Sequence, residues 1–465
     1  MSRNQVVQTL QDAVGDARVL TDPEVMAGYV RDWTGRFVGR TCAVVRPVDT
    51  AQVAAIVEAC AHLEVALVPQ GGNTGLVGGG VPTRGEVVLS LRGLGEPLWI
   101  DAAAGQATVG AGVPVGVLRA AASAAGLAYG VDLASRDSAT IGGTVATNAG
   151  GLRVLQYGDT RAQLLGVEAV LGDGSVVSHL TGLSRDNTGY HLPSLLAGSE
   201  GTLGVVTAVR VRLVPATRAR AVGLLGLASV PDAVTVASLL RNSLPGLAAA
   251  ELMLTAGLDL VAETCALPRP LRGTHPAYLL VEVGGDTADG ETPLNTLAEA
   301  VAGLAGVRDA SLAGDQRGCQ ALWSYRERHP ESINTLGTPV KMDVTLPLAG
   351  LPTFIDAVPA TVTAIAPQAR TWLFGHVAEG NVHVNVTGAE TAGETAGERV
   401  EDGVFRLVAA SGGSISTEHG IGTAKRRWLP LNRSPVEIAM FRRIKQALDP
   451  VGILNPNVLI PPDTL

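Results

Sequence analysis

The sequence is short of aromatic side chains and of cysteine, and each shortage narrows what the protein can be. Phe, Trp and Tyr make up 3% of the 465 residues, so aliphatic side chains and alanine must fill the core. The few cysteines are dispersed and form no CxxC pair, which argues against a zinc ribbon and a disulfide framework and fits a reducing bacterial cytoplasm. They are Cys42, Cys60, Cys265 and Cys319.

The sequence also lacks a basic excess and a long apolar run. The formal net charge of −8 leaves no basic surface for nucleic acid or anionic lipid. No uninterrupted run of about 18 apolar residues occurs, so no membrane span is expected. The first 20 residues carry acids and lack a long apolar stretch, unlike a secretory signal. We expect a cytoplasmic protein of two or three domains, and a homodimer is one assembly that the sequence leaves open.

A glycine-dense loop lies between two predicted strands in the first quarter of the chain. Hydrophobic periodicity predicts a helix over residues 49–62 and a strand over 65–69, before the loop QGGNTGLVGGG at 70–80. Backbone N–H groups of such glycines can converge on an anion, and a diphosphate is the expected guest. The loop lacks a Walker ending and leads to a strand rather than a Rossmann helix. A flexible linker is the alternative, but it would not need the donors of Asn73 and Thr74.

Two further segments rich in small residues follow. Residues 131–151 (VDLASRDSATIGGTVATNAGG) leave room for a bulky planar ring against the backbone, although a tight turn would have the same composition. Residues 198–204 (GSEGTLG) precede an apolar strand and form a third candidate wall that is weak by itself. The three segments together indicate a cofactor cleft.

Histidines and carboxylates gather in two short motifs of the second half. The motif GHVAEGNVHVN carries His376 and His383, which would face opposite sides of a straight strand unless the EGN turn brings them together. The motif TEHGIG adds Glu418 and His419. Two imidazoles and one carboxylate with open positions suit Zn²⁺, Mn²⁺ or Fe²⁺. The alternative is a set of unrelated structural histidines, although three of only 8 fall in these two motifs.

The motifs, in this order and spacing, resemble those of the FAD-linked D-2-hydroxyacid dehydrogenases. These form the D-lactate and D-2-hydroxyglutarate dehydrogenase branch of the vanillyl-alcohol-oxidase/PCMH superfamily. PQGGNTGLVGG is similar to the pyrophosphate loop of the family, and TIGGTVATNAGG, DNTGY and GSEGTLG are similar to its other flavin contacts. The resemblance implies an α+β fold with a PCMH-type FAD-binding domain of two subdomains over 1–215. It further implies an α+β cap domain with an antiparallel sheet over 216–417, and a C-terminal helical segment over 418–465 that returns to the FAD domain.

The resemblance implies that FAD is bound non-covalently, because the first loop has no histidine where covalent flavoproteins of the superfamily commonly carry one. The residues implied as cofactor contacts lie in the small-residue segments and the C-terminal tail. They are Gln70, Gly71, Gly72, Asn73, Thr74, Gly75, Gly78, Gly79, Asp132, Thr140, Gly142, Gly143, Ala146, Thr147, Gly150, Gly151, Glu200, Gly201, Gly204, Val205, Val206 and Asn455.

The resemblance also assigns the metal and the catalytic base. GHVAEGNVHVN is similar to the GHxxDGNxHxN motif of the family and TEHGIG to its EHGIG motif. His376, His383 and Glu418 are then the ligands of a divalent metal, with zinc expected. His419 is the implied general base, and Asn385 is expected to help hold the substrate carboxylate.

Two cations are expected to bind carboxylates of the substrate. The segment WSYRE with Arg326, and the lysine fifteen residues later, Lys341, resemble the substrate-anion elements of the family. Arg326 could instead be a surface helix charge, whereas lysine is rare in this chain and occurs only at 341, 425 and 445. Pro330 stands where the 2-hydroxyglutarate enzymes carry threonine, so the substrate stays open among 2-hydroxyglutarate, lactate and similar acids.

The reaction implied is oxidation of a small D-2-hydroxy acid to the 2-oxo acid, by hydride transfer to flavin N5. Electrons would then pass to an electron-transfer flavoprotein or a quinone. Two other readings stay open. A zinc hydrolase would use His376, His383 and Glu418 but would leave the glycine segments unexplained. A flavin-binding protein without catalysis would have no use for His419.

Overall fold

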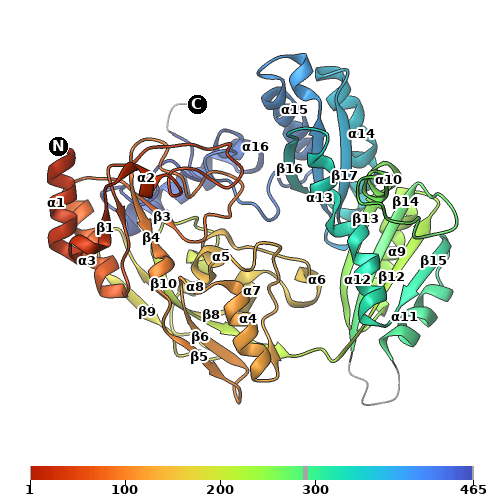
Figure 1. Ribbon diagram of the computed structural model, residues 1–465, viewed down its shortest axis with the longest axis horizontal. Helices are drawn as coiled ribbons and strands as arrows, with labels where there is room; N and C mark the ends of the chain where they lie inside the picture. The colour runs from red at the N-terminus through yellow and green to blue at the C-terminus, as the bar shows by residue number, and fades with distance from the viewer. Residues whose placement is uncertain (1, 286–291, 463–465) are drawn as a thin grey trace. The chain divides into compact units, whose positions relative to one another are not determined.

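The computed structural model describes residues 2–285 and 292–462 and consists of two compact units (Figure 1). Unit 1 comprises residues 1–152, 157–216 and 418–465, and unit 2 comprises residues 153–156 and 217–417. The C-terminal segment therefore packs with the first half of the chain. The short helix α6 (Val154–Tyr157) lies where the chain first passes between the units.

Unit 1 contains a four-stranded mixed sheet, a five-stranded antiparallel sheet and a small strand pair. The strand orders are β1-β2-β4-β3, in which β2, β4 and β3 are parallel, and β5-β6-β10-β8-β9. Apolar side chains from both sheets and from the surrounding helices share one core. The strands are β1 (Val19–Leu20), β2 (Val44–Val45), β3 (Leu67–Gln70), β4 (Val87–Ser90), β5 (Leu98–Asp101), β6 (Gln106–Gly110), β8 (Leu164–Val170), β9 (Val176–His179), β10 (Val205–Arg212), and the pair β7 (Leu127–Ala128) and β11 (Val214–Pro215).

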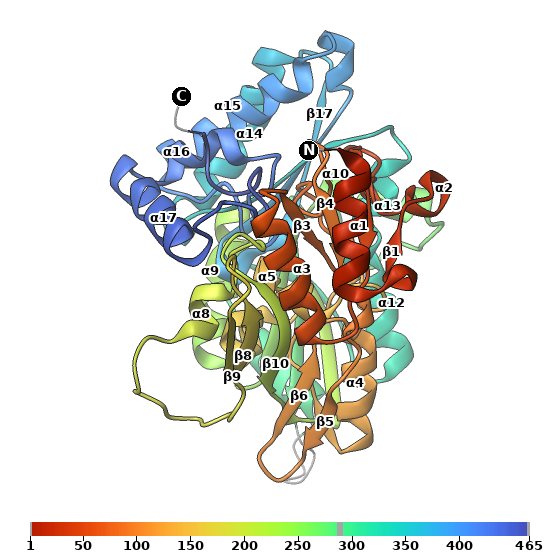
Figure 2. The same cartoon turned by 90° about the vertical axis from the view of Figure 1, so that its left-hand side faces the viewer.

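The helix predicted over residues 49–62 is confirmed as α3 (Thr50–His62). The Asp49 carboxylate accepts a hydrogen bond from the Gln52 N–H at 2.8 Å and caps it, and its apolar face is fully buried. Figure 2 shows α3 beside α1, the N-terminal helix. The other helices of unit 1 are α1 (Arg3–Val14), α2 (Pro23–Met26), α4 (Val115–Ala124), α5 (Ile141–Thr147), α7 (Thr160–Gln163), α8 (Leu192–Leu196), α16 (Leu429–Asn432) and α17 (Pro435–Leu448).

The second small-residue segment contains a helix that its composition does not predict. Gly142 and Gly143 are poor helix formers, yet they lie in α5, which Thr140 caps at its start. A Cβ at Gly142 would lie 2.6 Å from the Cβ of Ala111. Close packing against the end of β6 therefore requires the glycine that the helix propensity disfavours.

Unit 2 is built on a seven-stranded antiparallel sheet with the order β15-β12-β14-β13-β17-β18-β16. The α+β architecture with an antiparallel cap sheet is thus confirmed. The strands are β12 (Ala219–Leu227), β13 (Leu247–Leu254), β14 (Ala277–Gly285), β15 (Val307–Ala313), β16 (Val340–Thr345), β17 (Arg370–His376) and β18 (Asn381–Thr387). The helices are α9 (Val230–Ser243), α10 (Thr255–Thr264), α11 (Pro293–Ala302), α12 (Gln316–Glu327), α13 (His329–Asn334), α14 (Leu351–Ile365) and α15 (Ala396–Ala410).

One helical stretch, Leu348–Ile365, is long and apolar enough by composition to cross a membrane, with a mean hydropathy of 1.4. Core helices meet the same criterion, and most of this stretch is α14, which contacts β17 and α15. Its buried side chains are Leu351, Phe354, Ile355, Val358 and Val362.

Candidate active site

A cavity of about 590 Å³ in unit 1 is lined by all three small-residue segments. All but three of the residues predicted to contact FAD line it. These lining residues are Gln70, Gly71, Gly72, Asn73, Thr74, Gly75, Gly78, Gly79, Thr140, Gly142, Gly143, Ala146, Thr147, Gly150, Glu200, Gly201, Gly204, Val205 and Val206.

The three predicted contacts that do not line the cavity are Asp132, Gly151 and Asn455. Asn455 donates from Nδ2 to the carbonyls of Gly79 (2.9 Å) and Glu200 (2.8 Å), so it ties the first segment to the third. Asp132 is buried and forms ion pairs with two arginines at 3.2 Å, Arg119 and Arg136. Asp132 and Asn455 therefore stabilise the segments that form the cavity walls, although they do not line the cavity themselves.

Uncharged groups make up most of the cavity lining. Among its described lining residues there is no lysine, arginine, cysteine or tyrosine, and His419 is the one imidazole. Backbone N–H groups of the glycine loop must therefore supply the positive partial charge for a diphosphate. Arg92, which is not a lining residue, donates to the carbonyls of Gly71 (3.2 Å) and Gly72 (2.9 Å) and so holds the peptide groups of the loop.

Some lining residues lie outside the three predicted segments, and Asp32 and Trp33 are two of them. Asp32 and Trp33 lie in the N-terminal part of the chain, and the Trp33 Nε1–H donates to the Thr74 carbonyl at 3.0 Å. The available signal was composition, because Trp33 is one of only 5 tryptophans and is 63% exposed.

Glu200 fixes the loop that follows His419. Its carboxylate accepts the N–H groups of Ile421 (2.7 Å) and Gly422 (2.6 Å). Burial raises the pKa of Glu200 above its ordinary value, and these two hydrogen bonds offset only part of that rise. The loop is also held by the Val77 carbonyl, which accepts the N–H of Thr423 at 2.9 Å. The EHGIG segment is thereby attached to two cavity walls, and both Glu418 and His419 line the cavity.

The sheet of unit 2 brings together side chains that are far apart in the sequence. Its register places Glu251 opposite His376 and places Phe374 opposite His383. On the other side of β18, Asp343 is opposite His383 and Lys341 is opposite Asn385. Because side chains two residues apart share a face, all of these residues lie on one face of the sheet, and all but Phe374 are polar.

The turn predicted between the two histidines is present. A 3₁₀ turn, Val377–Glu379, and Gly380 at φ 77° reverse the chain between β17 and β18. The rings of His376 and His383 are consequently only 5.4 Å apart between centroids. A residue with a side chain at position 380 would need a backbone conformation that glycine adopts far more readily.

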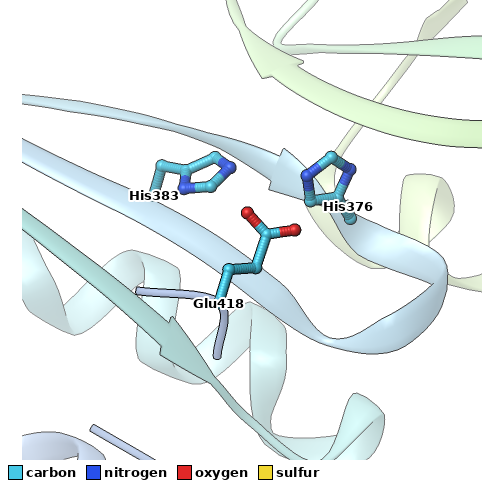
Figure 3. Close-up of side chains that lie close together, drawn as sticks. All are labelled: His376, His383 and Glu418. Carbon is cyan, nitrogen blue, oxygen red and sulfur yellow. The ribbon is translucent and has the colours of Figure 1, made fainter. Parts of the chain in front are cut away.

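Glu418 completes a group able to hold a metal ion. It directly follows Thr417, whose N–H donates to the Asp343 carboxylate at 3.2 Å. The ligand atoms of His376, His383 and Glu418 all lie within 4.8 Å of one another. Figure 3 shows the carboxylate directed toward the two rings. Two imidazoles and a carboxylate are a donor set that zinc and related divalent ions accept, so these residues fit such an ion.

Arg326 is buried rather than a surface charge. Its side chain is 7% exposed, its Nε donates to Glu251 Oε2 at 2.7 Å, and its guanidinium lies 4.6 Å from the Phe374 ring centroid. It comes from α12, whereas Lys341 and Asn385 are neighbours on β16 and β18.

Glu251 is the most informative residue that the sequence reading missed. It is 1% exposed, and its carboxylate is bonded to both His376, at 2.6 Å, and Arg326. Burial raises its pKa, but His376 and Arg326 outweigh burial and lower the pKa to about 2. The signal was an acid alone in the apolar run LAAAELML of β13, where an unpaired charge would be costly.

Comparison with solved structures shows that this chain shares its fold with p-cresol methylhydroxylase and with an alkyldihydroxyacetonephosphate synthase. p-Cresol methylhydroxylase matches with a TM-score of 0.79 at 16% identity, over 98% of this chain and 96% of that one. An alkyldihydroxyacetonephosphate synthase matches with a TM-score of 0.73 at 17% identity, over 98% of this chain and 85% of that one. At these identities the likeness concerns the fold alone.

Sequence comparison adds the family. Residues 42–179 match the FAD binding domain family, and residues 216–459 match the C-terminal domain of FAD linked oxidases. The D-2-hydroxyglutarate dehydrogenase of Xanthomonas citri pv. viticola is 36% identical over 97% of this chain and 96% of its own length. The mitochondrial D-2-hydroxyglutarate dehydrogenase of Rattus norvegicus is 37% identical over 96% of this chain and 83% of its own length. The chain belongs to the FAD-linked D-2-hydroxyacid dehydrogenase family and is an FAD-dependent oxidoreductase of 2-hydroxy acids.

Proposed function

We propose that this enzyme oxidises a D-2-hydroxy acid with the help of a divalent metal, zinc being the expected ion, held by His376, His383 and Glu418. The observation that carries the proposal is the convergence of these three ligand atoms within 4.8 Å. The domain scheme that accompanies it assigns cofactor binding to residues 1–215, the cap to 216–417 and a returning segment to 418–465.

The residues around the proposed metal have separate tasks. His419 takes the proton of the substrate hydroxyl on its imidazole, which suits proton transfer near neutral pH. Asn385 holds the carboxylate next to that hydroxyl. When bound, FAD accepts the two electrons of the oxidation, and the divalent ion makes a coordinated hydroxyl more acidic.

We favour a dicarboxylic substrate such as 2-hydroxyglutarate over lactate. Arg326 and Lys341 supply cationic donors for a second carboxylate, beyond the one that Asn385 holds. Pro330, which replaces the threonine of the 2-hydroxyglutarate enzymes, is exposed in the first turn of α13. Its missing N–H costs no helical hydrogen bond there, because first-turn N–H groups have no partner within the helix.

The electron acceptor is proposed to be a carrier, either an electron-transfer flavoprotein or a quinone. A cytoplasmic location accompanies this proposal. It is supported by the four cysteines, which are all free thiols.

The test is reduction of a dye acceptor by a panel of D- and L-2-hydroxy acids, before and after metal removal. We expect turnover with D-2-hydroxyglutarate above D-lactate, none with the L enantiomers, and loss on chelation that added Zn²⁺ reverses. Undiminished turnover by protein shown to be free of metal would contradict the metal proposal. A preference for D-lactate would contradict the dicarboxylate.

A further inference from the structure

Glu251 accepts hydrogen bonds from two residues that have different tasks in the proposed function, metal binding by His376 and carboxylate binding by Arg326. Oε1 is 2.6 Å from His376 Nδ1, and Oε2 is 2.7 Å from Arg326 Nε. The three side chains come from β13, β17 and α12, and all are nearly inaccessible, with Glu251 at 1%.

We propose that Glu251 is a positioning residue that fixes the metal ligand His376 and the carboxylate-binding Arg326 relative to each other. It would thereby set the spacing between the metal and the far carboxylate of the substrate. This inference rests on the proposed function, because it needs His376 to bind a metal and Arg326 to bind an anion.

The first step concerns the tautomer of His376. An ionised carboxylate only accepts hydrogen bonds, so the proton of the hydrogen bond between His376 and Glu251 must be on Nδ1. The neutral ring then keeps its lone pair on Nε2, the nitrogen that would ligate a metal. Metal-binding histidines are commonly oriented in this way, by a carboxylate that accepts a hydrogen bond from the second ring nitrogen.

The second step concerns the orientation of Arg326. Its Nε edge is occupied by Glu251, and one face of the guanidinium lies over Phe374. Within residues 2–285 and 292–462, Glu251 is the one side chain or backbone group to which the Arg326 side chain is hydrogen-bonded. A carboxylate must therefore approach the two Nη groups end-on, and a lysine could not reproduce this geometry.

The third step is that only a carboxylate serves both partners. Glutamine offers one acceptor oxygen and one NH₂ donor. If its oxygen faces Arg326, its NH₂ faces Nδ1 of His376 and favours the tautomer in which Nε2 is protonated and cannot ligate a metal. If the amide turns the other way, it presents a donor to Arg326, which has no acceptor.

The alternative is that Glu251 is only part of a core ion pair. Glu282 provides a matched control, because it is another buried acid, 4% exposed, on the adjacent strand β14. It pairs with Arg153 at 3.3 Å and accepts from Trp323 Nε1 at 2.7 Å. Replacing it removes an equivalent buried charge without touching His376 or Arg326.

The experiment compares Zn²⁺ affinity, by competition with a chromophoric chelator, in FAD-loaded wild type, Glu251→Gln and Glu282→Gln. We expect Glu251→Gln to bind Zn²⁺ about 10- to 100-fold more weakly, with a higher KM for the dicarboxylic acid. We expect Glu282→Gln to keep wild-type Zn²⁺ affinity even where its melting temperature falls. FAD content and melting temperature report whether each variant folds.

Two further variants separate the outcomes. Arg326→Lys leaves the contact between Glu251 and His376 in place, so Zn²⁺ affinity should be preserved. The KM for the dicarboxylic acid should rise, because the guanidinium is lost. Glu251→Asp retains the charge but is one methylene shorter and cannot reach both partners, so it should lower Zn²⁺ affinity if Glu251→Gln fails to fold. Wild-type Zn²⁺ affinity in either folded Glu251 variant overturns this inference alone. A wild type that holds Zn²⁺ no better than His376→Ala overturns the proposed function as well.

Discussion

Substitution of Gly72 by alanine should weaken FAD binding, whereas the same change at Gly95, which does not line the cavity, should not. A Cβ at Gly72 would lie 2.0 Å from the Ser138 carbonyl oxygen and 2.7 Å from its carbon. These are backbone atoms of the second cavity segment, so the two walls would have to separate. At Gly95, which lies in unit 1 outside the cavity lining, an added Cβ meets nothing within 4 Å. Gly95→Ala is therefore a control with the same chemical change.

The expected size of the effect follows from the cost of overpacking, which is about 1–3 kcal/mol. If that cost falls on the bound state, FAD affinity drops by about 5- to 150-fold. The assay is titration of the apoprotein with FAD, followed by quenching of flavin fluorescence, with melting temperatures measured in parallel. Equal FAD affinity in Gly72→Ala and Gly95→Ala would refute the argument that backbone contact between the two walls shapes the site.

Three further outcomes follow from individual side chains. Arg92→Met removes the donors to the Gly71 and Gly72 carbonyls and should weaken FAD binding by about tenfold. Arg92→Lys should have an intermediate effect. Unchanged affinity of Arg92→Met in the same FAD titration would contradict this prediction. Burial of the His329 ring is the main cause, and the nearby charge of Arg326 the second, that lowers the pKa of His329 to about 3. The ring therefore stays neutral in the folded protein, whereas in the unfolded chain it takes up a proton below about pH 6.5. Stability should then fall by about 1.4 kcal/mol per pH unit as pH drops from 6 to 4, and denaturant titrations of His329→Gln should lack this component. His419→Ala should keep FAD bound but abolish turnover, and retention of more than a small fraction of the rate would remove its role as base.

The features predictable from the sequence are those whose chemistry is local. The glycine loop and the GHVAEGNVHVN motif carry their donors within about a dozen residues, so spacing alone indicates an anion cradle and a paired-histidine turn. The helix α5 was not predictable, because Gly142 and Gly143 disfavour it and only the approach to Ala111 explains it. Glu251 was missed for a related reason, since it meets His376 across 125 residues of sequence.

The described residues that line the cavity include no lysine or arginine, which bears on how FAD would be retained. Peptide dipoles carry no net charge, so dissolved ions screen their attraction for a diphosphate far less than they would screen an arginine or lysine. We therefore expect flavin occupancy to depend little on ionic strength. We also expect it to be lost mainly through mutations that add atoms where glycine leaves none, because the described lining has no lysine or arginine to remove.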